Sequence, residues 1–580
     1  MSEADTLMNP AAAAPPEAAV PVSNPSDPYE RQAQTFPRLS DEQVARAVAF
    51  GCVEDLPKGT VLFSRGDHTV DFFLVLEGNI EIYEDGPDGA PNVFTVHAKH
   101  QFTGELDLFN DRDILVGGRM GVDGRVARMS RPQFRRLLVA EPDIAETIMR
   151  AFILRRVGLM QHAQGAVTLV ASRSYAAGDG LRLQRFLSRN GYPLRVLDYE
   201  HDAAAARAVL EANGLGADDL PVVACGPKRL LRNPTNAALA ECLGISERIG
   251  PDEVFDVAVV GAGPSGLASA VYAASEGLRT LVLESEAPGG QAGTSSKIEN
   301  YLGFPTGVSG QALAGRAQVQ AMKFGARIAV PRTVARLDCE KRPYVLVLDD
   351  GTEVRSRAVV IATGARYQRL GQLENADRFE GGNGIHYAAT AIEAGLCERE
   401  EVAVVGGGNS AGQAAVYLSR HASHVHMLVR GDGLAASMSD YLVGRIEASD
   451  RITLHTNTEI VALDGERHLE RVTWRNKRSG EEETRPVTNL FLMLGAAPNT
   501  DWLKDCGVAL DHKGFVRVGG GGDDREHPRW GGRAPHMLET SRPGVFAVGD
   551  VRAGSVKRVA SSVGEGSVVV SSVHQVLAGN

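Results

Sequence analysis

The sequence predicts a multidomain fold in which an all-β roll and a small α/β unit precede two larger α/β units, one inserted within the other. Short apolar–polar alternations divided by Gly and Asp turns come first, strand and helix patterns then alternate, and two later strands each run into a glycine-rich loop. The expected units in chain order are a disordered leader (1–35), the β-roll (36–140), connecting helices (141–163), the small α/β unit (166–247), a first nucleotide domain (252–370 and 495–580) and an inserted one (371–494).

Length and charge fit a globular protein of several domains. A chain of 580 residues accommodates roughly three to five domains of about 100–200 residues. Its 61 basic and 72 acidic residues give a net charge of −11, which disfavours nonspecific binding to nucleic acid or to anionic membranes. No apolar run approaches the ~20 residues of a membrane span. The start is rich in Ala and Pro and lacks a basic segment before an apolar core, so we expect disorder there rather than a secretory signal.

The cysteines indicate a protein without disulfide bridges or a zinc site. No two of them have CxxC spacing. Unpaired cysteines fit a reducing cytoplasm, which is the expected location, and no metal-binding set is predicted. The six cysteines are Cys52, Cys225, Cys242, Cys339, Cys397 and Cys506.

Local patterns support the two N-terminal units. Runs such as VDFFLVLEGNIEIYEDG alternate apolar and polar residues between turns, which predicts the strands of a roll. Residues 132–162 change to helical spacing and predict one or two helices. Residues 166–247 then follow a β-α-β-α-β-α order that predicts a small α/β domain.

The first glycine-rich loop indicates an FAD site in a Rossmann-like domain. The strand Asp256–Val260 leads into GAGPSG and a helix, so the backbone can approach a pyrophosphate that faces the helix N-terminus. About twenty residues later the strand TLVLE ends at an acidic residue, where a ribose-binding carboxylate is expected. The residues predicted to bind FAD here are Gly261, Gly263, Pro264, Ser265, Gly266 and Glu284.

The second loop, GGGNSA, predicts a nicotinamide dinucleotide site. It follows the strand Val402–Val405, and the residue at the acid position after the next strand is Arg430. An arginine there can pair with a 2′-phosphate, which favours NADPH over NADH. The alternative is a solvent-facing arginine at a strand end. The predicted residues are Gly406, Gly408, Asn409, Ser410, Ala411 and Arg430.

Further segments support FAD as the tightly held cofactor, whose isoalloxazine would take hydride from the exchanging dinucleotide. An ATG turn, a GGQ segment and a late GVFAVGD segment are typical of flavoproteins, and a helix follows the last of these. The additional residues predicted to bind FAD are Gly290, Gln291, Asn300, Thr363, Gly364, Gly549, Asp550, Arg558, Val559 and Ala560.

On these motifs, residues 252–580 resemble the low-molecular-weight thioredoxin reductase family. GAGPSG, GGQ, IENYLGFP, ATGA, GGGNSAG and ETSRPGVFAVGD occur in the family's order. The resemblance implies a homodimer in which the NADPH domain can rotate between hydride transfer and delivery of electrons to an acceptor.

The resemblance also marks a difference, because the family's redox dithiol is missing. Ala388 and Ala391 stand where the family has its two cysteines, and alanine has no redox chemistry. Cys397 is single, so we interpret it as a buried or incidental cysteine. His386 is either a proton donor to the flavin or a local structural residue, and the second interpretation is favoured. No catalytic residue is therefore assigned.

Residues 36–140 resemble cyclic-nucleotide-binding domains, through the roll pattern, LVLEGNIEIY and FTGELDLF. The resemblance implies that Gly104 and Glu105 contact a cyclic phosphate and ribose, with an arginine some ten residues on. Ile114 stands near that position instead, and neither Arg112 nor Arg119 fits the spacing. Cyclic nucleotide binding and a degenerate roll used for contacts both stay open.

Residues 166–247 resemble a thioredoxin or glutaredoxin fold. The resemblance rests on VTLVASRSYAAGD, on Pro221 at the position of the fold's cis-proline, and on the final helix. Where the fold's CxxC belongs, the sequence reads Ser-Arg-Ser-Tyr at 172–175. Cys225 is interpreted as structural. This unit is thus predicted to lack its dithiol as well.

Together these features predict an NADPH-dependent FAD oxidoreductase of thioredoxin-reductase-like type, without the internal dithiol, that reduces an unidentified acceptor and is open to regulation by a cyclic nucleotide. The acceptor is a disulfide protein, a quinone, an iron–sulfur protein or oxygen. One alternative is a thioredoxin-disulfide reductase that acts without a relay. The other is a redox or cyclic-nucleotide sensor with little turnover.

Overall fold

The computed structural model describes residues 27–579 apart from 86–89, 110–111, 173–176, 227–228, 372, 374, 436–437, 520–529 and 531. Most of the predicted leader lies outside the described residues. Its last part is ordered, because the 3-10 turn η1 (Pro28–Glu30) and helix α1 (Gln32–Thr35) pack against a long helix of the roll. Of the helices in the described ranges, none combines the length and apolarity that crossing a bilayer requires.

The N-terminal roll consists of two antiparallel sheets around an aromatic core. Phe72, Phe102, Phe134 and Phe152 are fully buried there. Helix α2 (Asp41–Val48) precedes the strands; it was missed in the sequence, although Ser40 and Gln43 form a capping box at its start. The strands run in the orders β1-β7-β3 and β2-β6-β4-β5. Their bounds are β1 (Cys52–Leu56), β2 (Val61–Phe63), β3 (Phe72–Glu77), β4 (Asn79–Asp85), β5 (Pro91–Ala98), β6 (Gly117–Met120) and β7 (Gly124–Met129), followed by α3 (Arg131–Ala140) and α4 (Pro142–Gln161).

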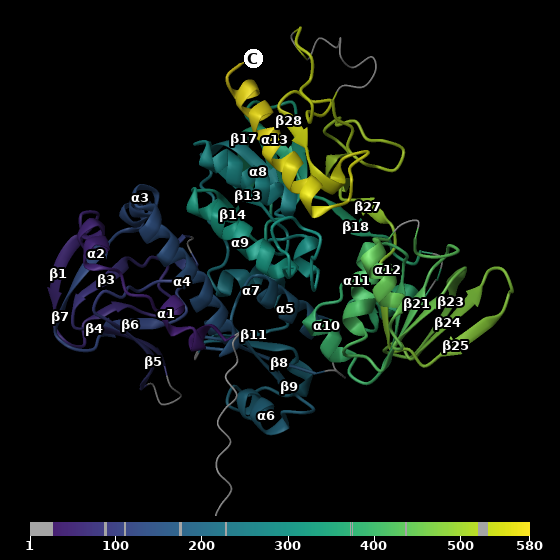
Figure 1. The fold of residues 1–580 in the computed structure, drawn as a ribbon, viewed down its shortest axis with the longest axis horizontal. Helices are drawn as coiled ribbons and strands as arrows, with labels where there is room; N and C mark the ends of the chain where they lie inside the picture. Colours follow the sequence, from purple (N-terminus) through teal and green to yellow (C-terminus); the bar gives the residue numbers. More distant parts are fainter. Residues whose placement is uncertain are drawn as a thin grey trace, which may run out of the picture.

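The small α/β unit has a four-stranded mixed sheet in the order β11-β10-β8-β9. The Leu220–Pro221 peptide bond before β10 is cis, at the position where the sequence resemblance places a cis-proline. In Figure 1 the unit lies between the roll and the inserted domain. Its elements are β8 (Val167–Ala171), α5 (Ala177–Arg189), β9 (Leu194–Asp198), α6 (Ala203–Glu211), β10 (Val222–Gly226), β11 (Arg229–Arg232) and α7 (Asn236–Cys242).

The first nucleotide domain is built on a sheet in which β12 pairs in parallel with β13 and β17. Apolar clusters cover both faces of this sheet, and the C-terminal helix packs against the first helix of the domain (Figure 1). Its main elements are β12 (Val254–Val260), α8 (Pro264–Ser275), β13 (Thr280–Leu283), α9 (Gly310–Lys323), β14 (Arg327–Ala329), β15 (Val334–Asp338), β16 (Tyr344–Leu348), β17 (Glu353–Ile361), β28 (Val545–Ala547) and α13 (Val559–Leu577).

The inserted domain is entered and left through two paired strands, β18 (Ala365–Tyr367) and β27 (Ala496–Pro498). Its main sheet has five parallel strands in the order β19-β26-β20-β21-β22. A three-stranded antiparallel sheet, β23 (Thr458–Asp464), β24 (Arg471–Asn476) and β25 (Glu482–Arg485), extends it. The remaining elements are β19 (Ile385–His386), α10 (Ala391–Leu396), β20 (Glu401–Val405), α11 (Asn409–Leu418), β21 (His424–Leu428), α12 (Asp440–Glu447), β22 (Ile452–His455) and β26 (Asn489–Leu492).

Candidate active site

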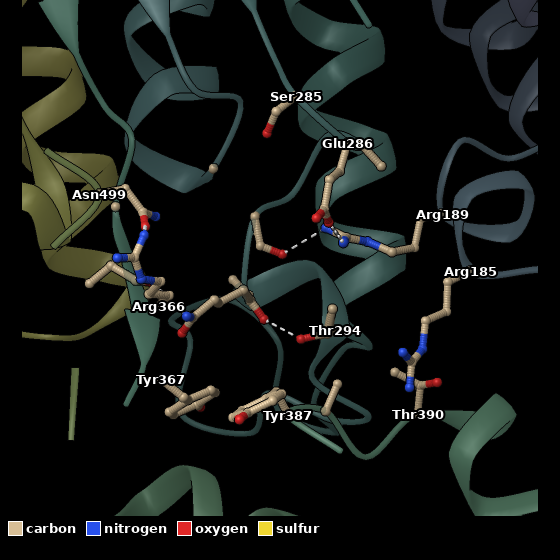
Figure 2. Close-up of a pocket in the computed structure, with 18 of the residues that line it drawn as sticks. Arg185, Arg189, Ser285, Glu286, Thr294, Arg366, Tyr367, Tyr387, Thr390 and Asn499 are labelled. Atoms are coloured by element: carbon tan, nitrogen blue, oxygen red, sulfur yellow. Dashed lines mark hydrogen bonds and ion pairs between the residues drawn. The ribbon is translucent and has the colours of Figure 1, made fainter. Parts of the chain in front are cut away.

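A cavity of about 1920 Å³ lies where three units of the chain meet. Its lining includes Gly261 and Gly263 of the first nucleotide domain and Ser410 of the inserted domain. Helix α5 of the small α/β unit closes one side through Arg185 and Arg189 (Figure 2). The first glycine-rich loop and the start of helix α11, which follows the second loop, therefore face the same space.

The first loop can turn sharply because Gly261 and Gly266 stand where a side chain would not fit. Gly261 has φ +103°, and a Cβ atom on it would lie 2.4 Å from the carbonyl oxygen of Ala362. A Cβ on Gly266 would lie 1.9 Å from the Gly261 oxygen, so helix α8 could not pack against the loop. This close packing leaves the N-terminus of α8 facing the cavity, which is the geometry that binds a pyrophosphate.

Glu284 follows β13 and lies beside this loop, as expected for a ribose-binding residue. Its carboxylate accepts hydrogen bonds from the backbone N–H of Ala262 at 2.7 Å and of Glu286 at 3.0 Å. Burial raises the pKa of Glu284, although these two amides act in the opposite direction. The side chain is thus held rigidly at the cavity wall.

Asp550 carries the clearest sign of a missing hydrogen-bond partner. Within the described part of the chain, its buried Oδ1 atom has none. Burial raises its pKa, while Lys557 lowers it. A buried carboxylate oxygen without a donor is rare and costly, so a ligand hydroxyl fits here, as the ribityl chain of FAD would supply.

The other residues predicted for FAD fall into two groups. Gly266 and Gly549 do not line the cavity; the Gly549 amide donates to Glu565 Oε2 at 2.7 Å. The rest do line it, namely Pro264, Ser265, Gly290, Gln291, Asn300, Thr363, Gly364, Arg558, Val559 and Ala560.

At the second loop, Asn409 and Ser410 line the cavity. Gly406 has φ +142°, and a Cβ there would lie 2.4 Å from the Met493 oxygen. Four predicted residues, Gly406, Gly408, Ala411 and Arg430, lie away from the cavity wall. Arg430 is exposed just beyond the end of β21.

The alanine segment reaches the cavity from the inserted domain. Ala388 and Thr390 line it, whereas Ala391 is exposed as the first residue of α10. The Thr390 hydroxyl caps this helix by accepting from the Ile392 N–H at 3.2 Å. Among the described residues that line the cavity, none is a cysteine.

The two other candidates near this segment are buried. Cys397 is fully buried, its thiol donates to the Glu393 carbonyl at 3.1 Å, and burial raises its pKa to about 12. His386 is 1% exposed and does not line the cavity. Its Nε2 lies 2.8 Å from Asn489 Oδ1, and burial lowers its pKa to about 4. A neutral, enclosed imidazole does not suit a proton donor to the cavity, so the local structural interpretation is favoured.

Helix α5 ties the small α/β unit to both nucleotide domains, which no sequence motif indicated. Arg185 Nε lies 2.7 Å from Glu393 Oε1, and the Glu393 side chain is only 1% exposed. Arg189 Nη1 lies 2.9 Å from Glu286 Oε2, and its Nη2 donates to the Gly290 carbonyl at 3.1 Å. Figure 2 shows Arg189 reaching Glu286, and Arg185 beside Thr390.

The two residues of the roll predicted to contact a cyclic nucleotide have protein partners. Arg156 of α4 pairs with Glu105 and with Asp107, each at 2.6 Å, and all three side chains are largely buried. Arg155 donates to the Gly104 carbonyl at 2.9 Å. The adjoining cavity holds about 70 Å³, whereas ligand pockets usually hold ~300–1,000 Å³.

Among the described residues that line this small cavity, Arg155 is the one arginine, and the position ten residues after Gly104 is Ile114. Ile114 is buried beside the small cavity. Arg112 instead donates to the Asn190 carbonyl at 3.0 Å, and Arg119 pairs with Glu81 at 2.9 Å.

Comparison with known proteins matches two parts of the chain. The family model described as pyridine nucleotide-disulphide oxidoreductase matches residues 255–566, and the cyclic nucleotide-binding domain model matches residues 53–141. The fold class expected from the sequence is thereby confirmed, with a roll ahead of the dinucleotide-binding fold.

Individual relatives agree with the family models. The chain is 31% identical over 372 residues to NADPH-dependent thioredoxin reductase 3 of Arabidopsis thaliana, covering 61% of this chain and 66% of that protein. It is 30% identical over 323 residues to thioredoxin reductase of Bacillus subtilis, covering 56% and 94% respectively. The crystal structure of Lactococcus lactis thioredoxin reductase (FR conformation) matches with a TM-score of 0.50 and 25% identity, over 56% of this chain and all of that one.

Proposed function

Because the chain belongs to the pyridine nucleotide-disulphide oxidoreductase family and is a thioredoxin-reductase-like FAD- and NAD(P)H-dependent oxidoreductase, we propose that it passes electrons from NADPH to an acceptor without an internal dithiol. The observation that carries the proposal is the shared cavity. The first glycine-rich loop lines it together with Asn409 and Ser410 at the end of the second, while the segment where a dithiol would stand contributes Ala388 and Thr390.

The residues proposed to hold FAD fit its parts one by one. The N-terminus of α8, with Gly263 as its N-cap and Pro264 as its first residue, would face the pyrophosphate. Glu284 is placed to accept from ribose hydroxyls, and the unpartnered Oδ1 of Asp550 from a ribityl hydroxyl. When bound, the flavin supplies hydride acceptance and onward electron transfer. The protein orients it and holds its charged part.

For the second dinucleotide, we propose the loop before α11, with Gly408 at the helix N-cap and Asn409 and Ser410 at the cavity wall. Arg430 stands beyond the end of β21, where the 2′-position of an adenosine ribose would lie in this fold. NADPH is therefore the proposed donor, and NADH is the competitor.

Arg430→Ala is expected to raise KM for NADPH about 10- to 100-fold and to leave kcat nearly unchanged. A charged hydrogen bond contributes about 1.5–3 kcal/mol, and this one would be made equally in ground and transition states. KM for NADH should hardly change. Steady-state kinetics with both dinucleotides checks this, with Arg420→Ala as an exposed control in the same domain. Equal effects on both dinucleotides would contradict the assignment.

Anaerobic stopped-flow mixing tests the reductive half of the function. NADPH should bleach the flavin absorbance of the purified protein, and NADH should do so more slowly. Adding a disulfide protein, a quinone, an iron–sulfur protein or oxygen to the reduced enzyme then identifies the acceptor by the return of absorbance. If neither dinucleotide bleaches the flavin, the proposed function is wrong; fast reoxidation by thioredoxin would favour the reductase that acts without a relay.

The roll match favours a second candidate, a cyclic-nucleotide sensor, but its geometry argues against it. Glu105 is already paired with Arg156, and the cavity beside it, of about 70 Å³, is smaller than the ~300–1,000 Å³ of usual ligand pockets. We expect neither cAMP nor cGMP to give binding heat, corresponding to a Kd weaker than about 1 mM. Tighter binding of either nucleotide in calorimetry, with a change in the rate of flavin reduction, would support the sensor.

A further inference from the structure

The inserted domain is joined to the first nucleotide domain at two points of the chain. The chain enters it through β18 and leaves it through β27, two paired strands of three residues each. Two domains linked in this way move relative to each other unless further contacts hold them, because relative motion is the default for domains without a large apolar interface. The position of the inserted domain therefore depends on noncovalent contacts elsewhere.

Helix α5 of the small α/β unit supplies such contacts. Its first turn lies against the loop before β19, because a Cβ atom on Gly178 would lie only 2.0 Å from the carbonyl oxygen of Gly381. About two turns further along, Arg185 Nε lies 2.7 Å from Oε1 of the buried Glu393 in α10. These contacts attach the first part of the helix to the inserted domain.

The last part of α5 contacts the first nucleotide domain instead. Arg189 Nη1 lies 2.9 Å from Glu286 Oε2. The Asn190 side chain donates to the Glu286 carbonyl at 3.0 Å, and Gln311 of α9 donates to the Ser188 carbonyl at 2.8 Å. In Figure 1 the helix lies between α9 and α10. One helix of 13 residues thus bridges the two domains.

A direct ion pair joins the same two domains. Arg445 of α12 pairs with Glu299 of the first nucleotide domain: Nη1 donates to Oε2, and Nη2 donates to Oε1 at 3.3 Å. Rotation of the inserted domain about its two strands would break this pair and the Arg185–Glu393 pair together. In the arrangement that these pairs hold, the start of α11 faces the cavity that the first glycine-rich loop also lines.

We propose that α5 is a brace that positions the inserted domain for flavin reduction, and that the chain completes its reaction without rotation of that domain. This inference rests on the proposed function. The rotation that the family resemblance implies would deliver electrons through a dithiol, and this chain has Ala388 and Ala391 at those positions. Gly178 and Arg185 are positioning residues, since they act through the loop at Gly381 and through Glu393.

Gly178→Ala tests the brace without weakening the helix. Alanine forms helices more readily than glycine, so the small α/β unit should stay folded, but the new methyl group collides with the Gly381 carbonyl. At saturating NADPH, anaerobic stopped-flow mixing should show flavin reduction slowed on the order of 10- to 100-fold, because a misplacement of about 1 Å has effects of this size. The dissociation constant for NADPH should change less than about twofold, since the loop before α11 is untouched.

Three further variants make this result specific. Gly395→Ala adds the same methyl group on α10, where no atom lies within 4 Å of an added Cβ, and should reduce its flavin at the wild-type rate. Arg185→Ala should slow flavin reduction as Gly178→Ala does. Arg185→Lys should recover part of that rate, because lysine keeps a positive charge opposite Glu393.

Distances between two spin labels report on the brace independently of activity. The full-length parent carries serine at the three cysteines that are not buried, Cys52, Cys225 and Cys242. The labels are attached at Arg336→Cys in β15 and Arg420→Cys after α11, one exposed position in each domain. Pulsed electron paramagnetic resonance on the flavin-loaded protein then gives the distribution of distances between the two domains.

The parent should give one narrow distribution that NADPH does not change, and Gly178→Ala in this parent should give a broader or shifted one. A second population that NADPH increases in the parent would overturn the proposal. So would an unaltered distribution or an unaltered rate of flavin reduction in Gly178→Ala. Wild-type flavin that NADPH does not bleach would instead contradict the proposed function, and the distances alone then confirm or overturn the brace.

Discussion

Gly263→Val is expected to give a folded protein that holds little or no FAD. Gly263 has ordinary backbone angles, with φ −70°, and the nearest heavy atom to an added Cβ is 4.0 Å away, at Gly290. The valine therefore fits the protein itself, at a cost of about 1 kcal/mol for a poor helix N-cap. Its methyl groups would fill the space that lets the protein backbone approach the pyrophosphate of FAD. The affinity for FAD should therefore fall on the order of 100-fold, or roughly 3 kcal/mol.

The flavin-to-protein absorbance ratio measures this loss, and circular dichroism checks the fold. Gly315→Val is the matched control, because Gly315 lies in α9 with no atom within 4 Å of an added Cβ and does not line the cavity. It should keep its flavin. Gly266→Ala should behave differently again and misfold, because its Cβ would collide with the Gly261 oxygen. Full flavin content in Gly263→Val would place the cofactor elsewhere.

Arg185→Ala is expected to lower the free energy of unfolding by about 3 kcal/mol at neutral pH, because it leaves the Glu393 carboxylate buried without its partner. Burial raises the pKa of Glu393, but Arg185 and Thr390 outweigh it and bring the pKa below its usual 4.5. The stabilisation from this pair is therefore present above about pH 4.5 and is lost as pH falls through the folded-state pKa. The difference between wild type and variant should narrow at acidic pH.

Urea unfolding at pH 7 and at about pH 4 tests both parts of this expectation. Adding Glu393→Gln to Arg185→Ala should recover part of the loss, because it removes the buried charge. Arg150→Ala is the control: it breaks an exposed pair with Glu146, with side chains 57% and 72% exposed, and such pairs contribute about 0–1 kcal/mol. A loss that is the same at both pH values would show that packing, and not charge, sets the effect.

The glycine loops could be predicted from the sequence because their constraint is local. There is no room for a side chain at Gly261 or Gly266. A strand followed by a GxGxxG run and a helix therefore indicates a dinucleotide-binding loop from the sequence alone. The roll, the small α/β unit and the inserted domain followed from periodicity in the same way. Helix α2 was missed because its eight residues carry only a short apolar pattern. The ordered end of the leader was missed because its order comes from packing on α4.

What the sequence could not provide are contacts between distant residues. Arg185 and Glu393 are 208 positions apart and belong to no motif. At the roll, the missing arginine near Ile114 could be read from the sequence, but the occupation of Glu105 by Arg156 required the fold.

The docking of α5 has a consequence for which molecules can reach the cavity. The small α/β unit is covalently attached to the domains that it covers, so its effective concentration at that face is on the order of millimolar. A separate protein present at micromolar concentration would need roughly a thousandfold tighter intrinsic binding to displace it. Small molecules face no such competition, because they need only enter a space of about 1920 Å³. The covalent attachment of the small α/β unit therefore favours small molecules over separate proteins as visitors to the cavity. This preference comes from the high local concentration of the attached unit and not from any one contact.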